Sequence, residues 1–130
     1  MHTGSCFCGA VRYEVLGDLG AAYYCYCSRC RKISGSAFTS NAVVSPDDFA
    51  VTSGKDMLKA FTTDDGISRS FCSVCGSSIA VSQGNQMRLR LGSLDTRLLR
   101  PPQMHIYTAS KAAWVEIHDD LPQHAERPES

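Results

Sequence analysis

The sequence has 130 residues, of which 43% are hydrophobic and 20% charged, and its formal net charge is zero. A chain of this length is expected to form one domain with a real core. Zero net charge argues against a partner held by a broad basic surface, such as duplex nucleic acid. No apolar run is long enough to span a membrane, and no apolar segment of a signal peptide follows Met1. We therefore expect a cytoplasmic protein with neither a nucleic-acid nor a membrane partner.

Short strands separated by turns are the predicted pattern along most of the chain. Apolar and charged residues alternate with period two at residues 11–15, as in a half-buried strand. Similar patterns predict strands at residues 21–24, 38–44, 49–53, 57–62, 67–71, 78–82, 87–91, 105–107 and 114–117. In the segment 87–91, Arg88 and Arg90 share one face, and the apolar residues between and beside them share the other.

A single short helix is predicted over residues 28–34, with Ser28 as its N-cap and Gly35 at its end. The expected fold class is therefore mainly β, with one or two short helical turns. We expect one domain over residues 1–118. Residues 119–130 are polar and contain two prolines, which predicts a loosely ordered C-terminal tail.

The seven cysteines fall into three clusters, and each cluster has the spacing of metal ligands. An odd number of cysteines rules out a complete disulfide framework. Seven divides into four and three. Four thiolates close a structural zinc site, whereas three leave a position open for water or substrate, as in a catalytic zinc site. Metal binding also suits a reducing compartment better than disulfides do.

The first and last clusters together supply four ligands. Cys6 and Cys8 would point the same way in a strand, and Cys72-x-x-Cys75 followed by Gly76 is typical of a zinc knuckle. We expect these four cysteines to share one structural zinc that joins the N-terminus to the middle of the chain. The alternative is that they are free thiols or disulfides.

The middle cluster has three ligands: Cys25 and Cys27 from a strand end, and Cys30 from the following helical turn. The helix dipole and the neighbouring basic residues would stabilise thiolates there. An open three-thiolate zinc can accept a substrate thiol and hold it as a thiolate. The alternative is a second structural zinc completed by a distant ligand, for which His2, His105, His118 and His124 are the candidates.

With these motifs placed, the sequence resembles the glutathione-dependent formaldehyde-activating enzyme family, which includes centromere protein V. The resemblance rests on residues 4–13 around Cys6 and Cys8, residues 25–38 around the middle cluster, and residues 69–76 around Cys72 and Cys75. The pairs His105-Ile106, Trp114-Val115 and Leu121-Pro122 are similar to the family's closing pattern.

The resemblance implies a β-tent of short antiparallel sheets around a structural zinc. It implies structural ligands at Cys6, Cys8, Cys72 and Cys75, and catalytic ligands at Cys25, Cys27 and Cys30, with two zinc ions per chain. The implied activity is that of a carbon–sulfur lyase on a glutathione-type thiol adduct such as S-hydroxymethylglutathione. Glutathione is then the expected small-molecule partner.

Two other function classes compete with this one. The first is a zinc-stabilised protein-binding module without catalysis, because a fold by itself does not determine function. The middle cluster distinguishes the enzyme from the binding module, because a purely structural zinc site needs only the other four cysteines. The second is a nucleic-acid-binding zinc finger, which zero net charge and the lack of a basic recognition helix disfavour.

Overall fold

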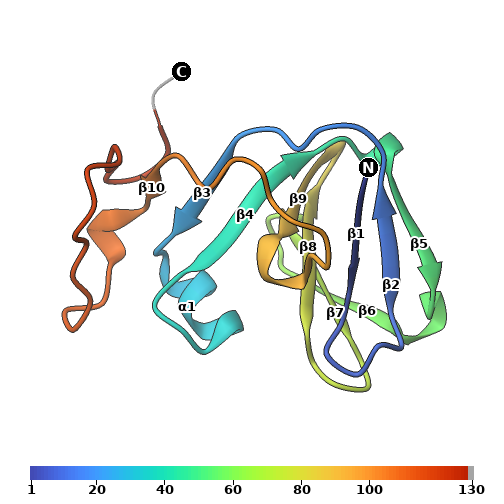
Figure 1. The fold of residues 1–130 in the computed structure, drawn as a ribbon. Coiled ribbons are helices and arrows are strands. Elements are labelled where there is room, and N and C mark those ends of the chain that lie inside the picture. The colour runs from blue at the N-terminus through green and yellow to red at the C-terminus, as the bar shows by residue number, and fades with distance from the viewer. Residues whose placement is uncertain (129–130) are drawn as a thin grey trace.

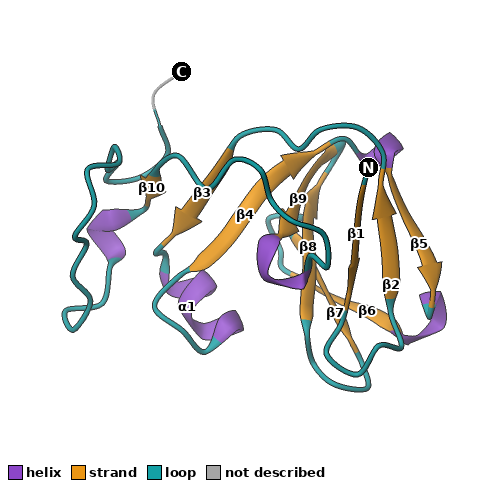
Figure 2. Cartoon of the chain, viewed as in Figure 1, coloured by secondary structure: helices purple, strands orange, loops and turns teal. Residues whose placement is uncertain are grey.

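Ten short strands form two sheets in residues 1–128, the part of the chain that the computed structural model describes (Figures 1 and 2). The smaller sheet has three antiparallel strands in the order β1-β2-β5. Their bounds are His2–Ser5 for β1, Arg12–Val15 for β2 and Phe49–Ser53 for β5. The predicted mainly-β fold class is thus confirmed.

The larger sheet has seven strands in the order β10-β3-β4-β9-β8-β7-β6. Their bounds are His105–Ile106 (β10), Ala22–Cys25 (β3), Thr39–Val44 (β4), Gln86–Arg90 (β9), Ser78–Gln83 (β8), Ser68–Cys72 (β7) and Leu58–Thr62 (β6). All neighbours in this sheet are antiparallel except β10 and β3, which are parallel. This parallel pair differs from the purely antiparallel expectation.

The short helix α1, Ser28–Ser34, has the predicted bounds, and Gly35 ends it in the left-handed conformation at φ 65°. The N-cap, however, is Cys27 and not the predicted Ser28, because the Cys27 sulfur accepts a hydrogen bond from the backbone N–H of Cys30 at 3.3 Å. Four short 3-10 turns accompany the helix within the described residues: Pro46–Asp48, Lys55–Met57, Leu91–Ser93 and Thr108–Ser110.

The core lies between the two sheets. Tyr13 and Val15 from β2 pack with residues from one face of the larger sheet, among them Ala42, Ala80 and Leu89. Register explains this pairing, since Leu89 lies opposite Ala42 on one side and opposite Ala80 on the other. The alternate residues of the same strands therefore face away from the core.

Three local expectations differ from the structure. Residues 114–117 form no strand, and Trp114 is 74% exposed. No neighbouring strand in the described chain offers that segment a partner. A strand at His2–Ser5 was not predicted. The expectation that Cys6 and Cys8 lie in a strand is wrong, because the strand ends at Ser5 and a turn follows.

Residues 119–128 run beside β10 and are hydrogen-bonded to it and to the residues after it. The N–H of His105 donates to the carbonyl of Pro122, and the N–H of His124 donates back to His105, each at 2.9 Å. The N–H of Tyr107 likewise donates to Glu126 at 2.9 Å. The division into a domain ending at residue 118 and a tail stays a prediction, and the last two residues of that tail lie outside the described part. No helix of residues 1–128 is both long and apolar enough to cross a bilayer.

Candidate metal centres and the adjoining pocket

Four cysteines from distant parts of the chain meet beside the smaller sheet. Cys6 and Cys8 come from the turn after β1, Cys72 ends β7, and Cys75 lies in the turn that follows. Their sulfur atoms all lie within 4.8 Å of one another. The Cys6 and Cys8 sulfurs are 3.6 Å apart, and those of Cys8 and Cys72 are 3.8 Å apart.

These distances fit a zinc ion. A tetrahedron with zinc–sulfur bonds of about 2.3 Å places its sulfurs about 3.8 Å apart. The cysteines are free thiols and form no disulfide among the described residues. Backbone geometry supports the same group: the Val11 N–H donates to the Cys6 sulfur at 3.2 Å, and Gly76 has the left-handed φ of 81° that the knuckle turn requires. This four-cysteine group could therefore hold a closed metal site.

The second group contains Cys25, Cys27 and Cys30, whose sulfurs also lie within 4.8 Å of one another. Cys25 ends β3, Cys27 caps α1, and Cys30 lies in the first helical turn. Hydrogen bonds from the Cys25 and Cys30 thiols lower the pKa of Cys27 to about 2, and the contacts with Cys27 and Cys30 raise the pKa of Cys25. The pKa of Cys30 is raised as well, so without an ion the close packing favours one thiolate at Cys27 hydrogen-bonded by two thiols. A metal ion would bind all three sulfurs as thiolates.

Within residues 1–128, no histidine joins either group of cysteines. His105 is held elsewhere: its Nδ1 lies 2.8 Å from the hydroxyl of Tyr26, and its Nε2 lies 2.9 Å from a carboxylate oxygen of Asp119. His2 contacts the hydroxyl of Thr96, and His118 lies beside Glu116. The three-cysteine group therefore differs from the four-cysteine group in having no fourth ligand among the described cysteines and histidines.

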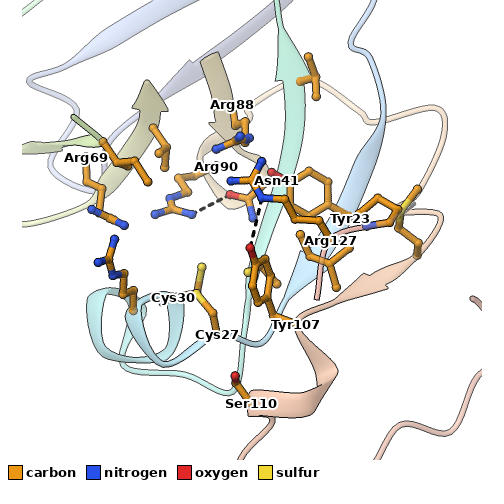
Figure 3. A pocket seen from close by; sticks show the side chains of 18 of the residues that line it. Tyr23, Cys27, Cys30, Asn41, Arg69, Arg88, Arg90, Tyr107, Ser110 and Arg127 are labelled. Carbon is orange, nitrogen blue, oxygen red and sulfur yellow. Dashed lines mark hydrogen bonds between the residues drawn. The ribbon is translucent and has the colours of Figure 1, made fainter. Parts of the chain in front are cut away.

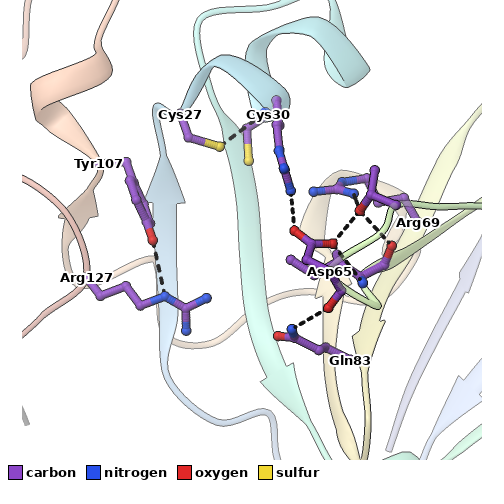
Figure 4. Close-up of polar contacts among 10 residues, drawn as sticks. Cys27, Cys30, Asp65, Arg69, Gln83, Tyr107 and Arg127 are labelled. Atoms are coloured by element: carbon purple, nitrogen blue, oxygen red, sulfur yellow. Dashed lines mark hydrogen bonds and ion pairs between the residues drawn. The ribbon is translucent and has the colours of Figure 1, made fainter.

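A cavity of about 600 Å³ opens beside the three-cysteine group (Figure 3). Its floor is the face of the larger sheet that points away from the core. The alternate residues Tyr23 of β3, Asn41 of β4, and Arg88 and Arg90 of β9 lie on this face. Tyr107 and Arg127 form a wall on one side of the cysteines, and Asp65 and Arg69 lie on the other side (Figure 4).

Five arginines line this cavity, namely Arg29, Arg69, Arg88, Arg90 and Arg127. One carboxylate, that of Asp65, lines it as well, and it pairs with Arg29 at 2.6 Å. Hydrogen bonds from Thr63 and Arg29 lower the pKa of Asp65 below its usual value, so this carboxylate is charged at neutral pH. The cavity is therefore strongly positive, apart from the sulfur atoms at its end.

Arg90 is the most buried of these arginines, with 7% of its surface exposed. Its Nη1 donates to the side-chain oxygen of Asn41 at 2.7 Å, and its Nε donates to the Ser78 hydroxyl at 3.1 Å. Burial lowers the pKa of Arg90, whereas the interaction with the neighbouring Cys30 acts in the opposite direction. A buried guanidinium is stabilised by hydrogen bonds and by a nearby anion, and thiolates in the three-cysteine group would supply that anion.

Sequence reasoning missed most of the cavity residues outside the cysteines. The alternation in 87–91 did place Arg88 and Arg90 on one face, but it did not show that this face lines the site. Asn41, Tyr107 and Arg127 carried no local signal. Tyr107 reaches the cavity from a left-handed backbone conformation at φ 56°, which is uncommon for an aromatic residue.

Together, the fold and the two cysteine groups define a mainly-β protein with two candidate metal centres, one closed and one open to a cavity. The family model of the glutathione-dependent formaldehyde-activating enzyme matches residues 1–110. The chain therefore belongs to this family, as its motifs had indicated, and the family name implies an enzyme that acts on glutathione adducts.

Individual proteins show the same likeness. A protein of Halomonas elongata named for this activity is 33% identical over 124 residues, which cover 88% of this chain and 79% of that protein. A protein of Talaromyces marneffei with the same name is 37% identical over 73 residues, or 55% of this chain and 39% of its own length. A crystal structure of a Rhodobacter sphaeroides protein superimposes with a TM-score of 0.62 at 25% identity, covering 75% of this chain and 91% of that one.

Proposed function

We propose that the protein is a zinc-dependent carbon–sulfur lyase that acts on a glutathione-type thiol adduct, such as S-hydroxymethylglutathione. Cys6, Cys8, Cys72 and Cys75 would hold a structural zinc ion. Cys25, Cys27 and Cys30 would hold a second ion at the reacting centre. We place this activity in the cytoplasm, because thiolate ligands persist in a reducing compartment.

One observation carries the proposal. Of the two cysteine groups, the one with three sulfurs adjoins a cavity of about 600 Å³ large enough for a small-molecule substrate. A zinc ion bound there would lower the pKa of a thiol that joins it and would hold that thiol as a thiolate. The family membership, with its named relatives, supports glutathione as the source of the thiol.

Cleavage of the carbon–sulfur bond requires the protein to bind the adduct and to stabilise the negative charge that develops on sulfur. In S-hydroxymethylglutathione, the bond between sulfur and the hydroxymethyl carbon breaks, and the sulfur leaves with the electron pair. The hydroxyl group gives its proton to solvent as its carbon–oxygen bond becomes the double bond of formaldehyde, so the products are formaldehyde, the thiolate and a solvated proton. Arg90 beside Cys30 offsets the negative charge that gathers at the sulfur atoms. The cavity walls keep the adduct oriented toward those atoms.

Exchange NMR of glutathione with labelled formaldehyde tests the proposal, since it measures how fast the adduct forms and breaks. The zinc protein should accelerate the interconversion, and Cys27→Ala should not. Cobalt-substituted protein gives a second readout, because a thiol that joins the metal should strengthen the sulfur-to-metal charge-transfer band. Absence of both effects in the wild-type protein would contradict the proposal.

A zinc-stabilised binding module remains the second candidate, on the basis of two exposed apolar side chains. Phe7, between Cys6 and Cys8, is 94% exposed, and Val74, between Cys72 and Cys75, is 62% exposed. Exposed apolar side chains on metal-held loops suit contact with another protein. The same NMR experiment separates the two functions, because a module without catalysis leaves the exchange rate unchanged.

A further inference from the structure

The cavity beside the three-cysteine group contains more positive charge than the chain itself neutralises. Within residues 1–128, Arg29 is the one cavity arginine that lies within ion-pair distance of a carboxylate. Arg69 donates a hydrogen bond to Thr63, and Arg90 donates to Ser78 and Asn41. Arg69 and Arg90 are also buried, whereas Arg88 is half-buried and Arg127 is exposed. Among the described residues Arg88 makes no side-chain hydrogen bond and Arg127 makes one, through its Nε, so both have N–H donors free for a ligand.

Arg88 lies on the cavity face of β9 between two apolar residues. It is directly opposite Val43 of β4 on one side and Val81 of β8 on the other. All three side chains line the cavity, and within the described chain no hydrogen bond engages the Arg88 side chain. Arg88 stands two residues before Arg90 on the same face, which places it about 7 Å from Arg90 along the strand, in the direction away from Cys25.

Arg127 reaches the same cavity from the C-terminal segment. The backbone hydrogen bond from Tyr107 to Glu126 fixes this segment beside β10. The Nε of Arg127 then donates to the Tyr107 hydroxyl at 3.2 Å, which directs the rest of the guanidinium into the cavity (Figures 3 and 4). Tyr23, on the floor of the cavity, is a neighbour of both arginines, because its hydroxyl group interacts electrostatically with Arg88 and with Arg127.

We propose that Arg88 and Arg127 form an anion-binding subsite that holds a carboxylate of the substrate while its sulfur lies at the three-cysteine group. This inference rests on the proposed function, and it adds a specificity determinant to it. Arg127 lies outside the family match, which ends at residue 110. The C-terminal segment of this chain thus contributes to substrate choice, and the preferred thiols carry their carboxylate several bonds from the sulfur.

A matched pair of thiols tests the subsite. Mercaptohexanoate and mercaptohexanol have the same chain length and differ in a carboxylate against a hydroxyl group. Isothermal titration calorimetry on the full-length zinc protein should show that mercaptohexanoate binds at least about tenfold more tightly, the effect of one charge-assisted hydrogen bond. Added salt should reduce this preference, because the contact lies at the mouth of an open cavity.

The variants assign the preference to the two residues. Arg88→Gln and Arg127→Gln should each reduce the ratio of the two affinities several-fold, and the double variant should bring it close to one. Arg100→Gln, which removes an exposed arginine outside the cavity, is the control and should leave the ratio unchanged. Arg127 is exposed, so its variant tests the subsite even if Arg88→Gln is unstable.

Failure of the subsite can be told apart from failure of the proposed function. Equal affinities of the wild-type protein for the two thiols, or no binding of mercaptohexanoate, would overturn the subsite. A preference that both variants retain would overturn it as well. The cobalt charge-transfer band reports separately on whether either thiol reaches the metal. A clear carboxylate preference with an unchanged cobalt band would show that the two arginines bind a carboxylate without the sulfur reaching the metal, and it would contradict the proposed lyase site.

Discussion

Arg90 and Asn41 lie opposite each other on neighbouring strands, and a hydrogen bond of 2.7 Å joins the guanidinium of Arg90 to the side-chain oxygen of Asn41. The pair is buried, with 7% and 2% of the two residues exposed. Asn41 thereby fixes a positive charge beside Cys30 at the base of the cavity. Because this positive charge is buried beside the cysteines, it should affect the metal affinity of the three-cysteine group.

Arg90→Gln should therefore weaken metal binding at the three-cysteine group. Loss of a group that supports metal ligands typically lowers metal affinity by about 10–100-fold. Competition with a chromogenic chelator measures this affinity. Arg12→Gln, on the exposed face of β2, is a matched control and should behave as wild type. Equal metal affinities in Arg90→Gln and wild type would show that the buried charge does not act on the cysteines.

Cys72→Ser should remove the structural metal site and destabilise the whole fold. Cys72 is fully buried and joins the β7 end to the N-terminal turn through its contact with Cys8. Metal binding contributes on the order of 10 kcal/mol to folding in small zinc domains. We expect insoluble protein or a much lower melting temperature. Cys27→Ser is the comparison, and it should keep a melting curve near that of wild type. A soluble Cys72→Ser with an unchanged melting curve would contradict the assignment.

The purified protein should bind two zinc ions with unequal lability. Three ligands hold an ion more weakly than four, and the cavity gives a chelator access to the three-cysteine group. Stepwise chelation followed by elemental analysis should remove one ion while circular dichroism stays unchanged. Simultaneous loss of both ions together with unfolding would favour two structural sites.

Tyr26→Phe should destabilise the protein without removing a metal ligand. Asp119 accepts a hydrogen bond from Nε2 of His105, so in the neutral ring Nδ1 accepts from the Tyr26 hydroxyl. Deleting that hydroxyl leaves a buried nitrogen without a partner, at a cost of about 1–3 kcal/mol. The shift in melting temperature measures this cost. Tyr24→Phe is the control, because the Tyr24 hydroxyl makes no hydrogen bond within residues 1–128. Similar shifts in both variants would rule out a specific role for the contact.

Much of the local structure could be predicted from the sequence. The helix at residues 28–34 and the strand at 49–53 have the predicted bounds, and the alternation in 87–91 separated core residues from Arg88 and Arg90. The prediction failed at 114–117, where a strand-like composition has no neighbouring strand to pair with in the described chain. It also failed at Cys6 and Cys8, whose sulfurs converge through a turn and not through strand alternation.

By itself, the sequence determined the three cysteine clusters, because ligand spacing within each cluster is a local property of two or three residues. The division into four and three followed from counting ligands, since neither outer pair alone fills a tetrahedron and the two together do. The charge and shape of the cavity, by contrast, were decided only by the tertiary structure. Arg88, Asn41 and Arg127 are far apart in the chain, and they meet because β9 pairs with β4 and the C-terminal segment runs beside β10. Such long-range contacts depend on strand order and register, which the pattern of any single segment does not specify.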